Sequence, residues 1–177
     1  MMEKPDSEKI IEQLGLKRHP FEGILFTQTY VSSDWLASDN LPPRYRSDKS
    51  VGTAIYYALT DAPDSFSVMH RLPTDEVYHF YLGDPVELLI LFPEGESRKV
   101  ILGQDILNGQ AVQYVVPRDT WQGSRLVPGG SFALLGTTMA PGYTEDDFEL
   151  GDREFLLVQY PDQAELIESL TTLETKG

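Results

Sequence analysis

The stretch His70-Arg-Leu-Pro-Thr-Asp-Glu-Val-Tyr-His-Phe-Tyr-Leu-Gly83 indicates the fold more clearly than any other part of the chain. It places two histidines and a glutamate on a strand pattern that ends in a Gly-Asp-Pro turn. A second block, Val115-Val-Pro-Arg-Asp-Thr-Trp-Gln122, follows further along the chain. Hairpins that join two such blocks can bring polar side chains from distant parts of a small β-barrel into one pocket.

Short strand patterns follow one another over most of the chain. Turn sequences such as Gly83-Asp-Pro85 and Leu107-Asn-Gly109 separate them. Many short strands with tight turns predict an all-β sandwich or barrel rather than a parallel α/β sheet. The expected strands are Gly23–Val31, Ala54–Leu59, Ser65–His70, Glu76–Leu82, Val86–Phe92, Ser97–Leu102, Ala111–Val116, Ser124–Leu126, Phe132–Met139 and Glu154–Tyr160.

Two short helices are expected, one near each end of the chain. Asp6 or Ser7 can cap a helix over about 6–15, which Gly15 would end. Asp162 followed by Glu165 resembles a capping box, and the apolar spacing after it predicts a helix over about 162–173. The least regular stretch, Ser32–Gly52, fits a lid, an interface arm or a flexible insertion.

Composition limits the classes of function. The 177 residues fit one domain, 1–177, and carry a net charge of −14. Such an acidic chain repels phosphate backbones and anionic lipids, so we expect no nucleic-acid and no membrane partner. The chain has no cysteine, and its start lacks the order of a signal peptide. We therefore expect a cytoplasmic protein.

The two blocks resemble the paired motifs of metal-dependent cupins, in which two histidines and a glutamate of one block and a histidine of the other hold a metal. His70 and Glu76 match the first block, but Leu72 stands at the second histidine. In the second block Pro117 matches and Gln122 stands at the last histidine. Since two of four ligands are missing, we expect no metal or other cofactor. Weak binding of a divalent metal at His70 and Glu76 stays an open alternative.

Longer segments resemble the cupin-5 family of small RmlC-like cupins. They are Ala54-Ile-Tyr-Tyr-Ala-Leu59, Trp121-Gln-Gly-Ser-Arg-Leu126, Met139-Ala-Pro-Gly-Tyr143 and Asp147-Phe-Glu-Leu150. The resemblance implies an all-β double-stranded β-helix (a jelly-roll barrel), commonly a homodimer, with a pocket inside one mouth. The chain departs from the family at Gln28 and Val31, where the family has Glu and Arg.

His70 and Glu76 are the first candidates for chemistry. A histidine titrates near neutral pH, so His70 could be a general base that Glu76 orients, with Tyr143 as general acid. The alternative is a buried His–Glu contact that holds two strands together. Five further residues could bind a small polar ligand, although each is more often a packing residue: Tyr78, His79, Gln113, Trp121 and Gln122. Strict strand alternation sends His79 away from Glu76, so an outer-face role competes with a pocket role.

These observations predict a cupin that binds a small polar organic ligand, such as a sugar or sugar nucleotide. If the protein is an enzyme, a metal-independent epimerase or isomerase fits the candidate residues, by analogy with related sugar-nucleotide epimerases. A ligand-binding module without catalysis and a degenerate metal-dependent cupin enzyme are the alternatives.

Overall fold

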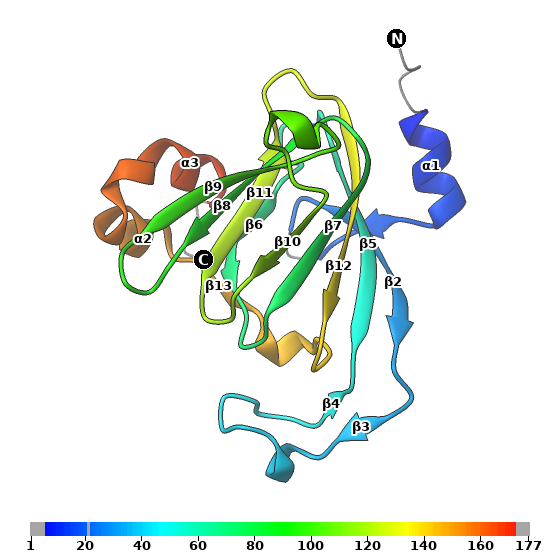
Figure 1. The fold of residues 1–177 in the computed structure, drawn as a ribbon, viewed down its shortest axis with the longest axis vertical. Helices are drawn as coiled ribbons and strands as arrows, with labels where there is room; N and C mark the ends of the chain where they lie inside the picture. The colour runs from blue at the N-terminus through cyan, green and yellow to red at the C-terminus, as the bar shows by residue number, and fades with distance from the viewer. Residues whose placement is uncertain (1–5, 21, 173–177) are drawn as a thin grey trace.

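Two antiparallel sheets form the body of the protein (Figure 1). The computed structural model describes residues 6–20 and 22–172. The six-stranded sheet has the order β1 (Lys17–Arg18), β2 (Leu25–Val31), β5 (Thr53–Thr60), β12 (Phe132–Met139), β7 (Glu76–Gly83) and β10 (Gln113–Val116). The five-stranded sheet has the order β13 (Glu149–Leu150), β6 (Ser67–Arg71), β11 (Trp121–Leu126), β8 (Val86–Leu91) and β9 (Ser97–Leu102).

The main core lies between the two sheets. On β7 the side chains alternate, and Tyr78 and Phe80 enter this core. On β8 both faces are buried: Leu88 and Ile90 join the same core, whereas Leu89 and Leu91 face the other way. This explains the continuous apolar run of β8, because a strand that is covered on both faces has no solvent-facing positions.

Helices cover the outer face of each sheet (Figure 1). Helix α1 (Ser7–Leu14) begins at Asp6, whose carboxylate accepts a hydrogen bond from the backbone N–H of Lys9, and ends at Gly15 with φ 63°. Its apolar side chains pack on the six-stranded sheet near Phe132 and Leu134. Helices α2 (Arg153–Gln159) and α3 (Ala164–Ser169) pack on the five-stranded sheet over Leu89 and Leu91. None of the helices among the described residues has the length and apolar character needed to cross a membrane.

The C-terminal part corrects the sequence expectations. Of the segment 154–160, predicted as a strand, residues 154–159 lie in helix α2 and Tyr160 follows its end. Asp152 caps this helix by accepting from the N–H of Phe155 at 2.7 Å. Pro161–Gln163 is a 3-10 turn, and α3 begins after Gln163 with no side-chain cap, so the capping box at Asp162 was wrong. The predicted helix is shorter than expected, and Leu173 lies outside the described residues.

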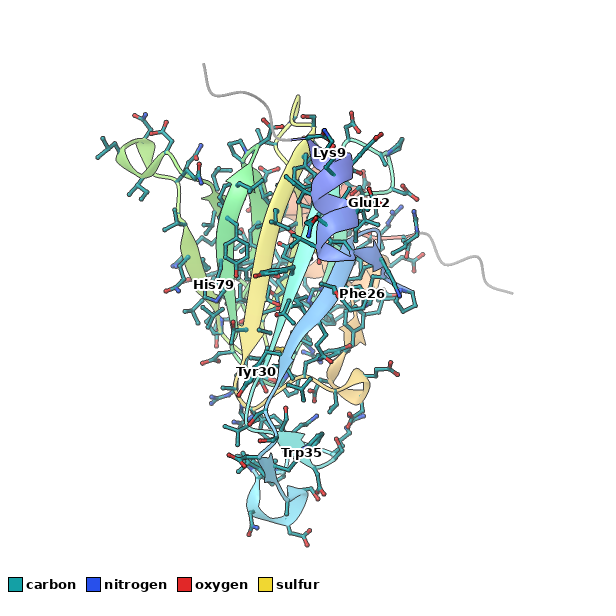
Figure 2. The ribbon with its side chains drawn as sticks, turned by 90° about the vertical axis from the view of Figure 1, so that its right-hand side faces the viewer. Lys9, Glu12, Phe26, Tyr30, Trp35 and His79 are labelled. Carbon is teal, nitrogen blue, oxygen red and sulfur yellow. The ribbon has the colours of Figure 1, made fainter. Side chains whose placement is uncertain are left out.

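The segment Ser32–Gly52 projects from the body as an arm. It contains a 3-10 turn, Ser38–Asn40, and a small hairpin in which β3 (Trp35–Leu36) pairs with β4 (Lys49–Ser50). Figure 1 shows this hairpin beyond the ends of β2 and β5, at the opposite end from α1. Trp35 lies on the arm and Tyr30 at the end of β2 that leads into it (Figure 2).

Candidate functional site

A cavity of about 860 Å³ opens between the sheets. Its walls come from β2, β5, β7 and β12 of one sheet, from β6 of the other, and from residues 15–20, 22–24 and 143–148. Both His70 and Glu76 line it, and Tyr143 lies in the same wall as Phe148. The structure therefore brings the three predicted catalytic residues to one cavity.

His70 is held on three sides. Its Nδ1 lies 2.7 Å from the carbonyl oxygen of Val68, and because a carbonyl only accepts, Nδ1 carries the proton. The Nε2 atom lies 3.9 Å from Oε2 of Glu76. The ring of Phe148 stacks on the imidazole, with centroids 4.9 Å apart and planes inclined by 17°. In its neutral form His70 therefore has its basic lone pair on Nε2.

Glu76 and Gln122 meet His70 from two directions. Gln122 pairs with His70 in the ladder between β11 and β6, while Glu76 begins β7 in the facing sheet. The Nε2 of Gln122 donates to Oε2 of Glu76 at 2.8 Å. The Oε1 of Gln122 is buried and has no hydrogen-bond partner among the described residues. The amide thus orients the carboxylate beside the imidazole.

The surroundings of His70 favour its protonated form. Burial alone would lower its pKa, but the contact with Glu76 and the charges of Glu22 and Glu76 outweigh burial and raise the pKa of His70 to about 8. Protonated His70 would then be compensated by carboxylates inside the cavity. The site is able to hold a proton on Nε2 or to release it slightly above neutral pH.

Glu22 and His19 are cavity residues that the sequence analysis did not propose for the site. The carboxylate of Glu22 accepts from Oγ of Ser67 at 2.6 Å, and its Oε1 lies 4.0 Å from Nδ1 of His19. The same Nδ1 accepts the backbone N–H of Glu22, which is the turn contact of a His-Pro corner. Burial lowers the pKa of His19 although Glu22 opposes this. The available signal was the close spacing of His19 and Glu22 around Pro20.

Tyr143 presents a phenol to the cavity. Its backbone N–H donates to Oγ1 of Thr53 at 3.0 Å, which fixes it beside β5. Burial, together with nearby carboxylates such as Glu22, raises the pKa of Tyr143 above its usual value. The phenol therefore keeps its proton at neutral pH.

The remaining candidates lie elsewhere. Tyr78 and Trp121 are buried in the two cores, and the guanidinium of Arg71 lies over the Trp121 ring. His79 lies on the outer face of the six-stranded sheet, because side chains alternate along a strand (Figure 2). Gln113 pairs with His79 in the ladder between β10 and β7. There Gln113 contacts Nδ1 of His79 at 3.2 Å. The structure does not bring these two residues into the cavity.

The residues of the site do not fit the metal centre that the cupin motifs would supply. No three His, Asp, Glu or Cys side chains come together in a way that could hold a metal ion within residues 6–20 and 22–172. At the two positions where the cupin motifs have further histidines, this chain has Leu72 and Gln122. Leu72 lines the cavity, and the side-chain amide of Gln122 donates to Glu76. A first-row metal needs more protein ligands than His70 and Glu76 provide.

Comparisons with known proteins give the same fold. A structure of protein SO0799 from Shewanella oneidensis has a TM-score of 0.80 and 31% identity, and the match covers 98% of this chain and all of that one. A hypothetical protein from Leishmania major has a TM-score of 0.80 and 25% identity, over 94% of this chain and 98% of that one. The uncharacterized protein YML079W of Saccharomyces cerevisiae is 27% identical over 121 residues, which are 66% of this chain and 59% of that protein.

Cupins of more distant sequence share the fold alone. Oxalate decarboxylase from Bacillus subtilis matches 88% of this chain with a TM-score of 0.51 and 12% identity, and 37% of its own chain is covered. Some proteins of this fold are therefore enzymes. The family model of Cupin_5, described as cupin superfamily (DUF985), matches residues 8–151. The chain belongs to this cupin family and has the cupin fold.

Proposed function

We propose that the protein binds a small polar organic molecule in the cavity and moves a proton at a carbon next to its carbonyl group, without a metal. The observation that carries this proposal is the fixed tautomer of His70. Because Nδ1–H is held by Val68, the neutral imidazole has its lone pair on Nε2, beside Glu76 in the cavity. The carbonyl of Val68 thus orients the ring, and Glu76 lies where it can stabilise the imidazolium once Nε2 has taken up a proton.

Each residue has one role in the proposed epimerase or isomerase reaction. His70 takes the proton as the C–H bond breaks, and the electron pair moves into the carbonyl as an enolate. Glu76 stabilises the imidazolium that forms, and Gln122 keeps Glu76 in place. Tyr143 gives its proton to the opposite face of the same carbon, since burial keeps the phenol protonated. Proton exchange with water then restores both groups.

The lining of the cavity supports a sugar or sugar nucleotide as the ligand class. Its volume of about 860 Å³ lies within the range of about 300–1,000 Å³ that is usual for small-molecule sites. The carboxylates of Glu22, Glu76 and Glu145 can accept hydrogen bonds from hydroxyl groups, and Phe26 and Phe148 offer apolar ring faces. Lys17 and Arg18 also line the cavity, where positive charge would attract a phosphate.

Binding without catalysis is the second candidate, and one observation favours it. With a pKa of about 8, His70 is protonated in roughly nine of ten molecules at pH 7. An imidazolium donates rather than accepts, so it could hold a carboxylate or phosphate instead of removing a proton. A ligand would then stabilise the fold and dissociate without chemical change.

A ligand screen separates the two candidates. Keto-sugars and nucleotide sugars are tested for thermal stabilisation of the protein, and each ligand that binds is examined by NMR for inversion of a stereocentre or isomerisation. The proposal expects conversion by the native protein and none by His70→Gln, with His79→Gln as the matched control from the outer face. If ligands bind but none is converted at any pH between 6 and 10, the proposed catalysis is wrong and the protein is a binding module.

We also propose that the protein is a homodimer. Large apolar side chains are exposed on and beside the arm, among them Trp35 at 58% and Tyr30 at 53%. Exposed apolar groups of this kind are typical of contact surfaces. Light scattering of the purified protein tests the proposal, since a monomer at micromolar concentration would contradict it.

A further inference from the structure

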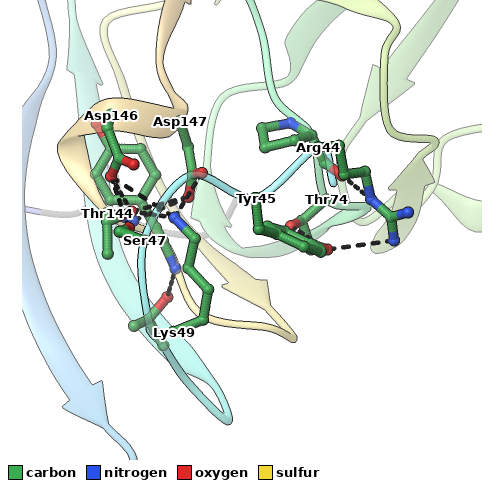
Figure 3. Close-up of polar contacts among 11 residues, drawn as sticks. Arg44, Tyr45, Ser47, Lys49, Thr74, Thr144, Asp146 and Asp147 are labelled. Atoms are coloured by element: carbon green, nitrogen blue, oxygen red, sulfur yellow. Dashed lines mark hydrogen bonds and ion pairs between the residues drawn. The ribbon is translucent and has the colours of Figure 1, made fainter. Parts of the chain in front are cut away.

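Lys49 is a wholly buried cation at the base of the arm (Figure 3). It belongs to β4, and its Nζ lies 2.6 Å from Oδ1 of Asp147 and 3.7 Å from Oδ1 of Asp146. The same ammonium donates to Oγ1 of Thr144. A buried ammonium is stable only if opposite charge and acceptors surround it, so these contacts join the arm firmly to the segment 144–147.

Asp147 holds the shape of that segment. Its Oδ2 accepts the backbone N–H of Thr144 at 3.0 Å, while the hydroxyl of Thr144 donates to the neighbouring carboxylate of Asp146. Thr144 and Asp147 together form the capping box of the 3-10 turn Glu145–Asp147. Lys49 therefore neutralises the carboxylate on which the turn depends.

The turn is a wall of the cavity. Tyr143, Thr144, Glu145 and Phe148 line the cavity from this segment. Phe148, the residue directly after Asp147, is the ring that stacks on His70. Beside Lys49, the carbonyl of Ser50 accepts the N–H of Gly142 at 2.8 Å. Contacts of the arm thus flank the stretch that carries the phenol and the stacking ring.

We infer that Lys49 is a positioning residue of the cavity, which holds Phe148 on the ring of His70 through Asp147. Without the ammonium, Asp147 would be a buried carboxylate with no counter-charge, and it would reach water only if the segment 144–148 moved outward. Phe148 would then leave His70, and Tyr143 would lose its fixed place. The effect on turnover rests on the proposed function, whereas the effect on the His70 ring does not.

The test measures the NMR signal of the His70 Cε1 proton, which we expect the ring current of the stacked Phe148 to shift upfield. The Phe148→Leu variant gives the position of this signal without the ring. In Lys49→Met we expect the signal to move downfield, toward its position in Phe148→Leu. The matched control is Lys99→Met, because Lys99 is an exposed lysine of β9, and it should leave the signal unchanged.

The double variant Lys49→Met/Asp147→Asn decides the question if the single variant does not fold. It contains no unpaired buried charge, and an asparagine side chain can still accept the N–H of Thr144. The inference expects the His70 signal of this variant near its native position, because no unpaired charge drives the segment outward. A folded Lys49→Met variant with the signal at its native position would overturn the inference, and so would a double variant whose signal moves as far as in Phe148→Leu.

The proposed function can fail separately. If no carbonyl compound binds the native protein, the proposed function is wrong, and the position of the His70 signal still decides the role of Lys49. If a substrate is converted, Lys49→Met should lower kcat/KM together with the change in the His70 signal, and Lys99→Met should change neither.

Discussion

Nε2 of His70 and Oε2 of Glu76 lie 3.9 Å apart although the two residues belong to different sheets. The chain crosses from β6 to β7 between them. Gln122 lies on β11 beside His70 and donates to Glu76, so it links the two sheets at the same place. Contacts of these three side chains therefore span the space between the sheets.

The stability of the fold should depend on the protonation of His70. Its pKa is about 8 in the folded protein and 6.5 when unperturbed. A raised pKa contributes stability that is fully present below pH 6.5 and is lost as the pH rises through 8, by up to about 2 kcal/mol. Urea unfolding at pH 6 and pH 9 should show this loss in the native protein and not in His70→Gln. An equal loss in both proteins would show that His70 is not the titrating group.

Glu76→Gln should lower the pKa of His70. The substitution removes the charge beside Nε2, while burial, which lowers the pKa, remains. We expect a fall of about one unit or more, measured by NMR titration of the histidine signals. The exposed Glu96→Gln is the control. An unchanged pKa would mean that Glu22 alone supports the imidazolium.

Leu72→His combined with Gln122→His should create a metal site. These residues stand at the positions where the metal-dependent cupin motifs have histidines, and the neighbouring His70 and Glu76 would complete four ligands. After dialysis against zinc or nickel, the tag-free double variant should retain near-stoichiometric metal. Plasma mass spectrometry measures the metal content. The native protein is the comparison, and equal metal content in the two would contradict our description of the ligand set.

Leu156→Ala should destabilise the protein strongly because α2 packs this side chain into the core over β8. Leu156 is wholly buried, so the loss should be about 2–5 kcal/mol in urea unfolding. Val158 is 75% exposed on the same helix, and Val158→Ala should change stability by less than about 0.5 kcal/mol. Similar losses in both variants would argue against the orientation of this helix.

Sequence patterns predicted the sheets better than the C-terminal helices. Along β7 the alternation of buried Glu76, Tyr78 and Phe80 follows directly from the period of a strand. The run Phe155–Val158 is apolar throughout, so it fits a buried strand as well as a helix. The cap at Asp152 distinguishes the two, and this signal was overlooked.

For the site, motif spacing was informative only within regular strands. Strand register places Gln122 opposite His70, and the packing of the two sheets brings Glu76 to both of them. Glu22 and Phe148 come from irregular segments, whose conformation depends on tertiary contacts such as the bond between Ser67 and Glu22. Lys49 could not be placed from sequence, because its partners lie almost a hundred positions away along the chain.

Solvent deuterium exchange tests the central claim most directly. Tag-free, chelator-treated protein is incubated in D₂O with a keto-sugar that binds it, and deuterium at the carbon next to the carbonyl is followed by NMR. The account predicts incorporation without added metal, at a rate that rises with pH through about 8 as His70 loses its proton, and none with His70→Gln. Exchange that requires added metal, or that persists in His70→Gln, would contradict it.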